Sequence, residues 1–303
     1  MNRHVAIIGC GHVGADVAFS LVTQNLVDHL SLFDIKDAKA ASEQLELQDM
    51  AAHIGSRVHI DHNDEQQLSC ADIVIMAVGP SKTETSNRLR ELAETSASVA
   101  TWAPKLQAAG FDGVLINITN PCDVITMSLA RRLALPEGRV FGTGTSLDSA
   151  RMKRVVGKLL DVDPASVDGY VLGEHGESQF VAWSSVRVGG LSFSQWPQAE
   201  TADCAQMEAD IRRGGWDVLS GKGWTSFGIA TAAAKLVDAV FSDAHRVYAV
   251  SAIDQRFGVH IGQPALIGRC GVIRTIPIPL PAAEAEKYAA SATVIATAFQ
   301  KIC

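Results

Sequence analysis

The sequence predicts an α/β fold in which a doubly wound parallel sheet is followed by an α+β domain. In the first half, short and continuously apolar runs alternate with longer helical patterns, which is typical of a parallel sheet covered by helices on both faces. In the second half this alternation is lost. Of the 303 residues, 47% are hydrophobic and 19% are charged, a balance typical of a well-packed protein rather than a disordered one.

Five apolar runs in the first half are candidate strands, and three stretches with helical periodicity lie between them. The strands are Val5–Gly9, Leu30–Asp34, Val58–Ile60, Ile73–Val78 and Val114–Ile118, and the helices lie at about Val13–Asn25, Ala38–His53 and Glu84–Ala109. Strands that alternate with helices in this way form a parallel sheet. We expect this domain to span residues 1–142.

The second half, residues 143–303, groups its strands and helices instead of alternating them. We expect strands at Val167–Leu172, at Phe180–Val188 with an interruption at Trp183, at Val247–Ser251 and at Gly271–Ile276. A helix-rich stretch follows the second of these from about Ala202 to Phe241, and a final helix runs from about Pro281 to Lys301. This is an α+β pattern. No internal repeat or long linker separates the halves, so we expect them to pack tightly.

Charge and cysteine content argue against several classes of protein. The net charge of −7 argues against a nucleic-acid-binding protein, which usually carries a basic face. The apolar stretch after Met1 is short, broken by glycines and soon followed by Asp16, so we expect neither a signal peptide nor a membrane span. Six scattered cysteines without a C-x-x-C pair predict no disulfide and no cysteine-bound metal. We expect a cytoplasmic protein without a metal site.

A glycine-rich run follows the first strand and opens the first helix. The run Gly9-Cys10-Gly11-His12-Val13-Gly14 is a G-x-G-x-x-G motif, whose glycines permit a tight turn, close approach of a pyrophosphate, and packing of helix on strand. Asp34, twenty residues after Gly14, can accept hydrogen bonds from ribose hydroxyls. We therefore expect a Rossmann domain that binds NAD through Gly9, Gly11, His12, Val13, Gly14 and Asp34.

Parts of this nucleotide site allow alternatives. Asp34 would repel the 2′-phosphate of NADP, although Lys36 nearby leaves that cofactor open. An S-adenosylmethionine site also combines a glycine loop with an acidic residue, and a purely structural turn would account for the glycines alone. Asn120, before Pro121 at a later strand end, either contacts the nicotinamide ribose or a substrate oxygen, or only forms a turn.

Three residues on neighbouring segments supply the parts of an acid–base reaction on an anionic substrate. Asp148 and Arg151 stand three positions apart, and His175 lies between small and acidic neighbours in Gly173-Glu174-His175-Gly176. A carboxylate can orient an imidazole, a guanidinium can hold an anion, and the imidazole titrates near neutral pH. Taken singly, each residue also has an ordinary structural explanation.

Together, these residues resemble the L-lactate/L-malate dehydrogenase superfamily. The glycine loop, Asp34, Asn120-Pro121, Asp148-x-x-Arg151 and Gly-Glu-His175-Gly follow its order and spacing across nearly the whole chain. Within the superfamily, the sequence looks most similar to the L-2-hydroxyisocaproate dehydrogenase type. The runs that carry this similarity are Gly142–Thr145, Asp148–Met152, Ser178–Trp183 and Gly221–Ser226.

The resemblance implies roles for the candidate residues. His175 would exchange a proton with the substrate C2 oxygen while Asp148 holds its ring. Arg151 would bind the substrate carboxylate with two parallel hydrogen bonds, which the point charge of lysine cannot reproduce. The remaining positions that the family pattern places near cofactor or substrate are Gly79, Asn120, Thr143, Thr225 and Ile229.

The family pattern also implies a mobile lid with a fourth catalytic residue. The polar stretch Pro80–Asn87 leads to Arg88, which would polarise the substrate carbonyl when the lid closes. Arg90 is an alternative if the register differs. Lys82 stands where lactate enzymes carry glutamine and malate enzymes carry arginine, and it either pairs with a second substrate carboxylate or extends into solvent.

Two glycines bear on the substrate side chain. Gly214 and Gly215 match a place where lactate enzymes tend to have alanines. Losing two methyl groups widens a cavity and fits a longer aliphatic chain, of which each buried CH₂ contributes roughly 0.8 kcal/mol. Alternatively, the pair only bends a helix without touching substrate.

The resemblance predicts an NAD-dependent L-2-hydroxy acid dehydrogenase that acts on medium aliphatic or branched 2-oxo acids. An L-lactate dehydrogenase that prefers pyruvate is the alternative, and a malate enzyme is third because Lys82 replaces the expected arginine. A non-catalytic NAD sensor would need none of the acid–base residues. We expect a homo-oligomer, a tetramer by resemblance, with contact faces at 38–53 and 145–160.

Some bacterial lactate enzymes bind fructose-1,6-bisphosphate through an arginine and a histidine. The matching positions here are Lys153 and Asp168. Because a carboxylate repels phosphate, we expect no activation by this sugar.

Overall fold

A computed structural model describes residues 2–79 and 88–302, and of residues 88–91 only the backbone. Its central feature is a nine-stranded sheet in the order β14-β13-β12-β6-β5-β4-β1-β2-β3. Six strands are parallel: β1 His4–Ile8, β2 His29–Phe33, β3 His59–His62, β4 Ile73–Met76, β5 Val114–Asn117 and β6 Val140–Gly142. Their order, 3-2-1-4-5-6, is that of a dinucleotide-binding sheet.

Three antiparallel strands of the second half extend this sheet beyond β6. They are β12 Arg246–Asp254, β13 Val259–Gly268 and β14 Gly271–Thr275. β12 joins the parallel strands where Ser251 pairs with Gly142. One sheet therefore crosses the boundary expected between residues 142 and 143, and the division into two domains stays a prediction.

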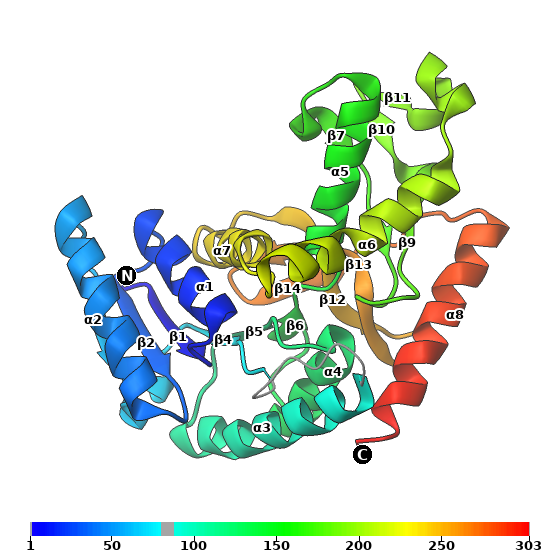
Figure 1. The fold of residues 1–303 in the computed structure, drawn as a ribbon. Coiled ribbons are helices and arrows are strands. Elements are labelled where there is room, and N and C mark those ends of the chain that lie inside the picture. The colour runs from blue at the N-terminus through cyan, green and yellow to red at the C-terminus, as the bar shows by residue number, and fades with distance from the viewer. Residues whose placement is uncertain (1, 80–87, 303) are drawn as a thin grey trace.

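Helices cover both faces of the sheet (Figure 1). One face packs against α1 His12–Thr23, α2 Asp37–Ile54 and α7 Phe227–Phe241, and the other against α3 Arg88–Ala109, α4 Cys122–Leu133 and α8 Ala282–Phe299. All residues of β1 and β4 are buried, which explains their continuously apolar sequence. The helix α2 ends at Gly55, whose φ of 69° favours glycine.

A smaller lobe projects from the sheet around α5 Ser146–Leu160 and α6 Cys204–Lys222 (Figure 1). Met152, Val156 and Leu160 recur every four residues, so one face of α5 packs into a separate apolar cluster. Short elements complete the lobe and its base: β7 Val167–Asp168, β8 Val171–Leu172, β9 Phe180–Val181, β10 Arg187–Val188 and β11 Leu191–Ser192, with 3₁₀ turns at Pro164–Ser166, Trp183–Ser185, Phe193–Gln195 and Pro197–Thr201. A further 3₁₀ turn, Glu65–Ser69, lies in the first half.

The predicted α/β fold class is confirmed, and the five strands predicted in the first half occur within two residues of their expected ends. One predicted strand of the second half is wrong. Val167–Leu172 is interrupted at Gly169, whose φ is 133°, so that β7 and β8 join different sheets. The predicted interruption of Phe180–Val188 at Trp183 is confirmed, since the turn Trp183–Ser185 separates β9 from β10.

Among the strands of the large sheet and the helices that cover it, three have no counterpart in the prediction: β6, α4 and β13. β6 has only three residues, too few to show a pattern. β13 is interrupted in sequence by Gly262, Gln263 and Pro264, and a proline within a run argues against a strand. Pairing with two neighbours, β12 and β14, compensates for this weak local signal.

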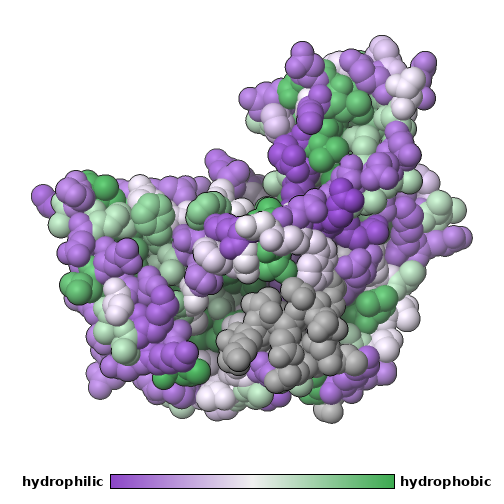
Figure 2. Space-filling model, in the orientation of Figure 1, coloured by the Kyte–Doolittle hydropathy of each residue, from purple (hydrophilic) through white to green (hydrophobic). Residues whose placement is uncertain are grey.

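Hydrophilic residues predominate on the face shown in Figure 2, with apolar residues scattered among them. Within residues 2–79 and 88–302, no helix has the length and apolar character needed to cross a membrane.

Candidate active site

The glycine loop forms the turn between β1 and α1, and its glycines differ in their surroundings. A Cβ on Gly14 would lie 1.8 Å from the carbonyl oxygen of Gly9, so the helix can pack on the strand only without a side chain. Gly9 has a φ of 102°, and a Cβ there would lie 2.6 Å from the Ala77 oxygen. A Cβ on Gly11 would meet no described atom within 4 Å apart from its own neighbours along the chain, which leaves room for a ligand.

Asp34 follows β2 and lies directly beside this loop. Its carboxylate accepts hydrogen bonds from the backbone N–H of Cys10 and of Lys36, both at 2.9 Å. At the start of α1, no side-chain hydrogen bond from the described residues caps the helix. Uncapped N–H groups at a helix N-terminus attract phosphate. The open space at Gly11, the uncapped helix and the anchored carboxylate fit the pyrophosphate and adenosine ribose of NAD.

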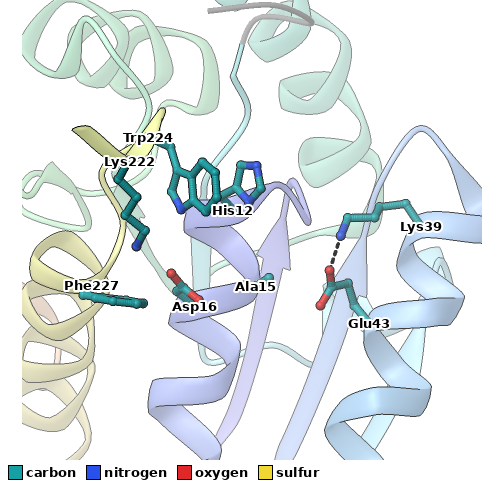
Figure 3. A pocket seen from close by; sticks show the side chains of 8 residues that line it. All are labelled: His12, Ala15, Asp16, Lys39, Glu43, Lys222, Trp224 and Phe227. Carbon is teal, nitrogen blue, oxygen red and sulfur yellow. Dashed lines mark hydrogen bonds and ion pairs between the residues drawn. The ribbon is translucent and has the colours of Figure 1, made fainter. Parts of the chain in front are cut away.

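A cavity of about 280 Å³ opens beside the loop, between α1, α2 and the segment that joins α6 to α7. Figure 3 shows the imidazole of His12 stacked on the indole of Trp224, with ring centroids 4.0 Å apart. Lys222 lies over the ring of Phe227. The place of Trp224 beside this loop could not be predicted, because nothing in the local sequence pattern indicates contact with residues more than 200 positions earlier.

Other predicted cofactor residues follow the parallel strands. Gly79 lies after β4, Asn120 after β5 and Thr143 directly after β6. Ligands of doubly wound sheets bind at these carboxyl ends. Ile229 lies on α7, which packs against α1. Val13 lies in the first turn of α1.

The three acid–base candidates form one hydrogen-bonded chain. Nδ1 of His175 lies 2.7 Å from Oδ2 of Asp148, and Nη1 of Arg151 donates to Oδ1 of the same carboxylate at 2.8 Å. Asp148 and Arg151 lie one turn apart on α5. His175 comes from the segment after β8, where Gly173 pairs with Gly262 of β13. Asp148 is fully buried, whereas 27% of the His175 side chain is exposed.

The charges of this chain shift the pKa of both titrating groups. Burial opposes ionisation of Asp148, but attraction to His175, the hydrogen bond from its ring and the Arg151 charge together hold the pKa of the carboxyl below its ordinary value. For His175, burial disfavours the imidazolium, and the Asp148 carboxylate outweighs it, so that the pKa of the ring is raised. The site thus favours imidazolium beside carboxylate.

A second buried carboxylate, Asp123 of α4, holds the backbone of the histidine. The N–H of His175 donates to Oδ2 of Asp123 at 2.7 Å, and Ser251 of β12 donates to Oδ1 at 2.6 Å. Burial raises the pKa of Asp123 to about 6. The sequence placed Asp123 next to Asn120-Pro121 but gave no sign that it contacts a segment 52 residues later.

Two of the predicted substrate residues, Gly214 and Gly215, lie beside Arg151. A Cβ on Gly214 would lie 3.4 Å from Cδ of Arg151, and one on Gly215 would lie 3.5 Å from Nη2. Both glycines of α6 therefore face the guanidinium. Thr225 lies between α6 and α7, beside Trp224.

Three predictions about the lid fall outside what the structure describes. Lys82 and the stretch Pro80–Asn87 lie outside the described residues. Arg88 begins α3, but its side chain is not described.

Lys153 and Asp168 are the positions compared with a sugar-phosphate site. The Nζ atom of Lys153 lies 3.9 Å from Oδ1 of Asp168, and the absence of activation by fructose-1,6-bisphosphate stays a prediction.

Comparison with known proteins identifies the family. Residues 3–142 match the family model of the lactate/malate dehydrogenase NAD-binding domain, and residues 145–302 match that of the lactate/malate dehydrogenase α/β C-terminal domain. "L-lactate dehydrogenase 3" of Bacillus cereus is 35% identical over 307 residues, covering 97% of each chain. "L-lactate dehydrogenase 1" of Bifidobacterium longum is 35% identical over 305 residues, covering 97% of this chain and 96% of that one.

Solved structures give the same result. The minor L-lactate dehydrogenase of Enterococcus mundtii, in a ligand-bound form, superposes with a TM-score of 0.95 at 28% identity, covering 100% of this chain and 99% of that one. A lactate dehydrogenase from a Medee basin deep-sea metagenome library gives 0.94 at 27% identity, with the same coverage. The chain therefore belongs to the lactate/malate dehydrogenase family and is an NAD-dependent 2-hydroxy acid oxidoreductase.

Proposed function

We propose that the protein is an L-2-hydroxy acid dehydrogenase that accepts 2-oxo acids with aliphatic side chains larger than the methyl group of pyruvate. The acid–base part of this proposal rests on the chain from His175 through Asp148 to Arg151. These hydrogen bonds link a proton donor, His175, to a carboxylate-binding group, Arg151. Reduction of any 2-oxo acid requires both groups, one for the C2 oxygen and one for the carboxylate.

The residues have distinct tasks in this proposal. Arg151 binds the substrate carboxylate with guanidinium nitrogens other than the Nη1 that donates to Asp148, which places the C2 oxygen toward His175. The Nε2 atom of His175 gives its proton to that oxygen during reduction and takes it back during oxidation. Asp148 holds the other ring nitrogen, so that Nε2 faces substrate, and stabilises the imidazolium. NAD supplies the hydride acceptor and donor when it is bound.

The proposed preference for a larger side chain depends on Gly214 and Gly215. If Gly214 carried a Cβ, the described atoms within 4 Å of it, apart from those of its own helix backbone, would belong to Arg151. The space that two side chains would fill thus lies directly beside the group that binds the substrate carboxylate. A longer aliphatic substrate can occupy it and gain roughly 0.8 kcal/mol for each buried CH₂.

Pyruvate is the second candidate substrate, and the relatives favour it. Relatives at 34–35% sequence identity, such as those of Bacillus cereus and Fusobacterium nucleatum, are named L-lactate dehydrogenases. A malate enzyme is third, since Lys82 stands where such enzymes carry arginine. The L-2-hydroxyisocaproate dehydrogenase type stays a prediction, as do the homotetramer and the cytoplasmic location. Exposed Leu45 and Ile54 on α2, 61% and 51% accessible, are consistent with the contact face expected there.

A substrate series tests the proposal. NADH oxidation is measured with pyruvate, 2-oxobutyrate, 2-oxoisocaproate, phenylpyruvate and oxaloacetate, for the wild type and for Gly214→Ala and Gly215→Ala. We expect kcat/KM to be highest for 2-oxobutyrate or 2-oxoisocaproate, and the alanine variants to lose activity on these more than on pyruvate. If pyruvate is the best substrate of the wild type, the second candidate is correct and the wide-pocket argument fails.

A further inference from the structure

A row of histidines crosses the sheet at the end opposite the nucleotide loop. In the parallel register, His4 of β1 pairs with His29 of β2, and His29 pairs with His59 of β3. Two positions further along, Ser31 pairs with Asp61. Because side chains two residues apart share one face of a strand, His29, His59 and Asp61 all project from the same face.

The distances within this group suit a shared ligand. Nε2 of His29 lies 2.5 Å from Oδ2 of Asp61, and Nε2 of His59 lies 3.9 Å from the same oxygen. One potential ligand atom from each of the three residues lies within 4.8 Å of the others. Ligand atoms of a tetrahedral ion bound at about 2.0–2.2 Å lie roughly 3.3–3.5 Å apart. To reach this spacing, the first contact would open by about 0.9 Å, so that the metal replaces the direct hydrogen bond between His29 and Asp61, and the second would close by about 0.5 Å.

The group combines a fixed part with an adjustable one. The ring of His29 is stacked on the buried ring of His4, with centroids 3.8 Å apart and an interplanar angle of 3°, and the Nε2 atom of His4 lies 2.8 Å from Ser31 Oγ. The His59 side chain is 72% exposed and lies edge-on against the His29 ring, with centroids 4.7 Å apart, whereas the side chains of His29 and Asp61 are only 12% and 19% exposed. Solvent thus reaches the group from the His59 side.

One of the two carboxylate oxygens of Asp61 is available to bind a cation. Its Oδ1 atom is buried and finds no hydrogen-bond partner among the described residues, and a buried carboxylate oxygen left unpaired costs free energy. His29 and His59 both approach the other oxygen, Oδ2, so a cation would compensate Oδ1 by binding both oxygens of the carboxylate together with the two imidazoles. Two imidazoles and one carboxylate suit a borderline transition metal such as Zn²⁺, whereas Mg²⁺ and Ca²⁺ prefer oxygen ligands.

We propose that His29, His59 and Asp61 form a binding site for a divalent transition metal of the Zn²⁺ class, completed by solvent. The site differs from the acid–base chain, because it lies at the amino ends of β2 and β3. Since β3 is the outer strand of the sheet, a metal bound here ties the edge strand to its neighbour. Its expected effect is on stability rather than on hydride transfer, and it does not depend on the proposed substrate.

Metal binding is measured on the full chain, freed of any polyhistidine tag and treated with chelator. Zn²⁺ titration calorimetry and visible absorption with Co²⁺ report affinity, stoichiometry and ligand geometry, and thermal unfolding reports stabilisation. We expect one Zn²⁺ per chain, Co²⁺ bands of a nitrogen–oxygen site, and a higher Tm with Zn²⁺. His59→Ala and Asp61→Asn should each weaken binding by more than about 100-fold, beyond the roughly 10–100-fold effect of outer-shell changes.

His245→Ala is the matched control. His245 is 60% exposed and lies 3.4 Å from Asp243, so it offers a similar histidine–aspartate pair in which the described residues provide no third ligand. This variant should bind Zn²⁺ like the wild type. Because His59 is exposed, its replacement leaves folding intact, which NADH binding and circular dichroism verify. Absence of Zn²⁺ binding, or binding unchanged in both His59→Ala and Asp61→Asn, would overturn the proposal.

Discussion

Two fully buried carboxylates flank His175, and they behave in opposite ways. Asp148 of α5 contacts the ring and the Arg151 guanidinium, and its pKa lies below the ordinary value. Asp123 of α4 contacts the backbone N–H of His175 and the Ser251 hydroxyl, and its pKa is raised to about 6. Burial is equally complete, so the difference comes from the partners: cationic groups for Asp148, neutral dipoles for Asp123.

The two carboxylates therefore have different roles toward His175. Asp148 acts through charge, because it stabilises the imidazolium form. Asp123 acts through position, because it holds the main chain that carries the ring. An asparagine keeps an acceptor oxygen but removes the charge, so the same substitution at the two sites distinguishes these roles.

The largest effect is expected for Asp148→Asn. The variant retains an acceptor for the ring but loses the charge that favours imidazolium, so kcat for 2-oxo acid reduction should fall by about 100-fold or more. Steady-state NADH oxidation measures this, with NADH binding by fluorescence as the control. A kcat within a few-fold of wild type would show that the charge of Asp148 is not needed.

A smaller effect on a different parameter is expected for Arg151→Lys. Lysine retains the positive charge near Asp148 but loses the planar pair of donors. We expect KM for the 2-oxo acid to rise by about 10- to 100-fold, corresponding to about 1.5–3 kcal/mol for hydrogen bonding to a charged group. An unchanged KM would contradict the assignment of Arg151 to the substrate carboxylate.

The pH dependence should follow the raised pKa of His175. Reduction needs the imidazolium, so its kcat/KM should be constant below this pKa and fall by about tenfold per pH unit above it. Oxidation of the 2-hydroxy acid needs the neutral ring and should show the opposite trend. In Asp148→Asn, the decline of reduction should move to lower pH. A decline at the same pH in both proteins would assign the titration to another group.

The smallest effects are expected at Asp123. Asp123→Asn can still accept from His175 N–H, and we expect kcat within a few-fold of wild type. Asp123→Ala leaves that buried donor unpaired, at a cost of about 1–3 kcal/mol in stability.

Stability should also depend on pH through Asp123. Its pKa is about 6 in the folded state, against 3.8 ordinarily, so the folded state holds the proton to higher pH and wild-type stability falls as pH rises through this range. Chemical denaturation at pH 4 to 7 should show no such loss in Asp123→Asn. A kcat as low as that of Asp148→Asn would remove the distinction between the carboxylates.

Patterns local in the sequence were sufficient to predict much of the fold and part of the candidate site. Continuous apolar runs located β1 and β4, and the glycine spacing located the turn where a Cβ on Gly14 would collide with Gly9. The three-residue spacing of Asp148 and Arg151 placed both on one side of a helix, where they are hydrogen-bonded.

The features that were missed depend on contacts distant in sequence. Asp123 reaches His175 across 52 residues, and His12 meets Trp224 across more than 200. The row of His4, His29 and His59 exists only in the register of three strands, which no local pattern specifies. The prediction of no metal site depended mainly on the scattered cysteines, because the spacing of the three histidines in the sequence does not reveal that they are neighbours in the sheet.

The pairing of Ser251 with Gly142 makes the two halves of the chain structurally interdependent. A hinge between them would have to break the sheet at β6 and separate Ser251 from Asp123. An excised segment 1–142 would expose the edge of β6 to other chains, which invites aggregation. For an engineer, these halves are therefore poor modules for exchange between relatives unless both sides of the β6–β12 seam are transferred together.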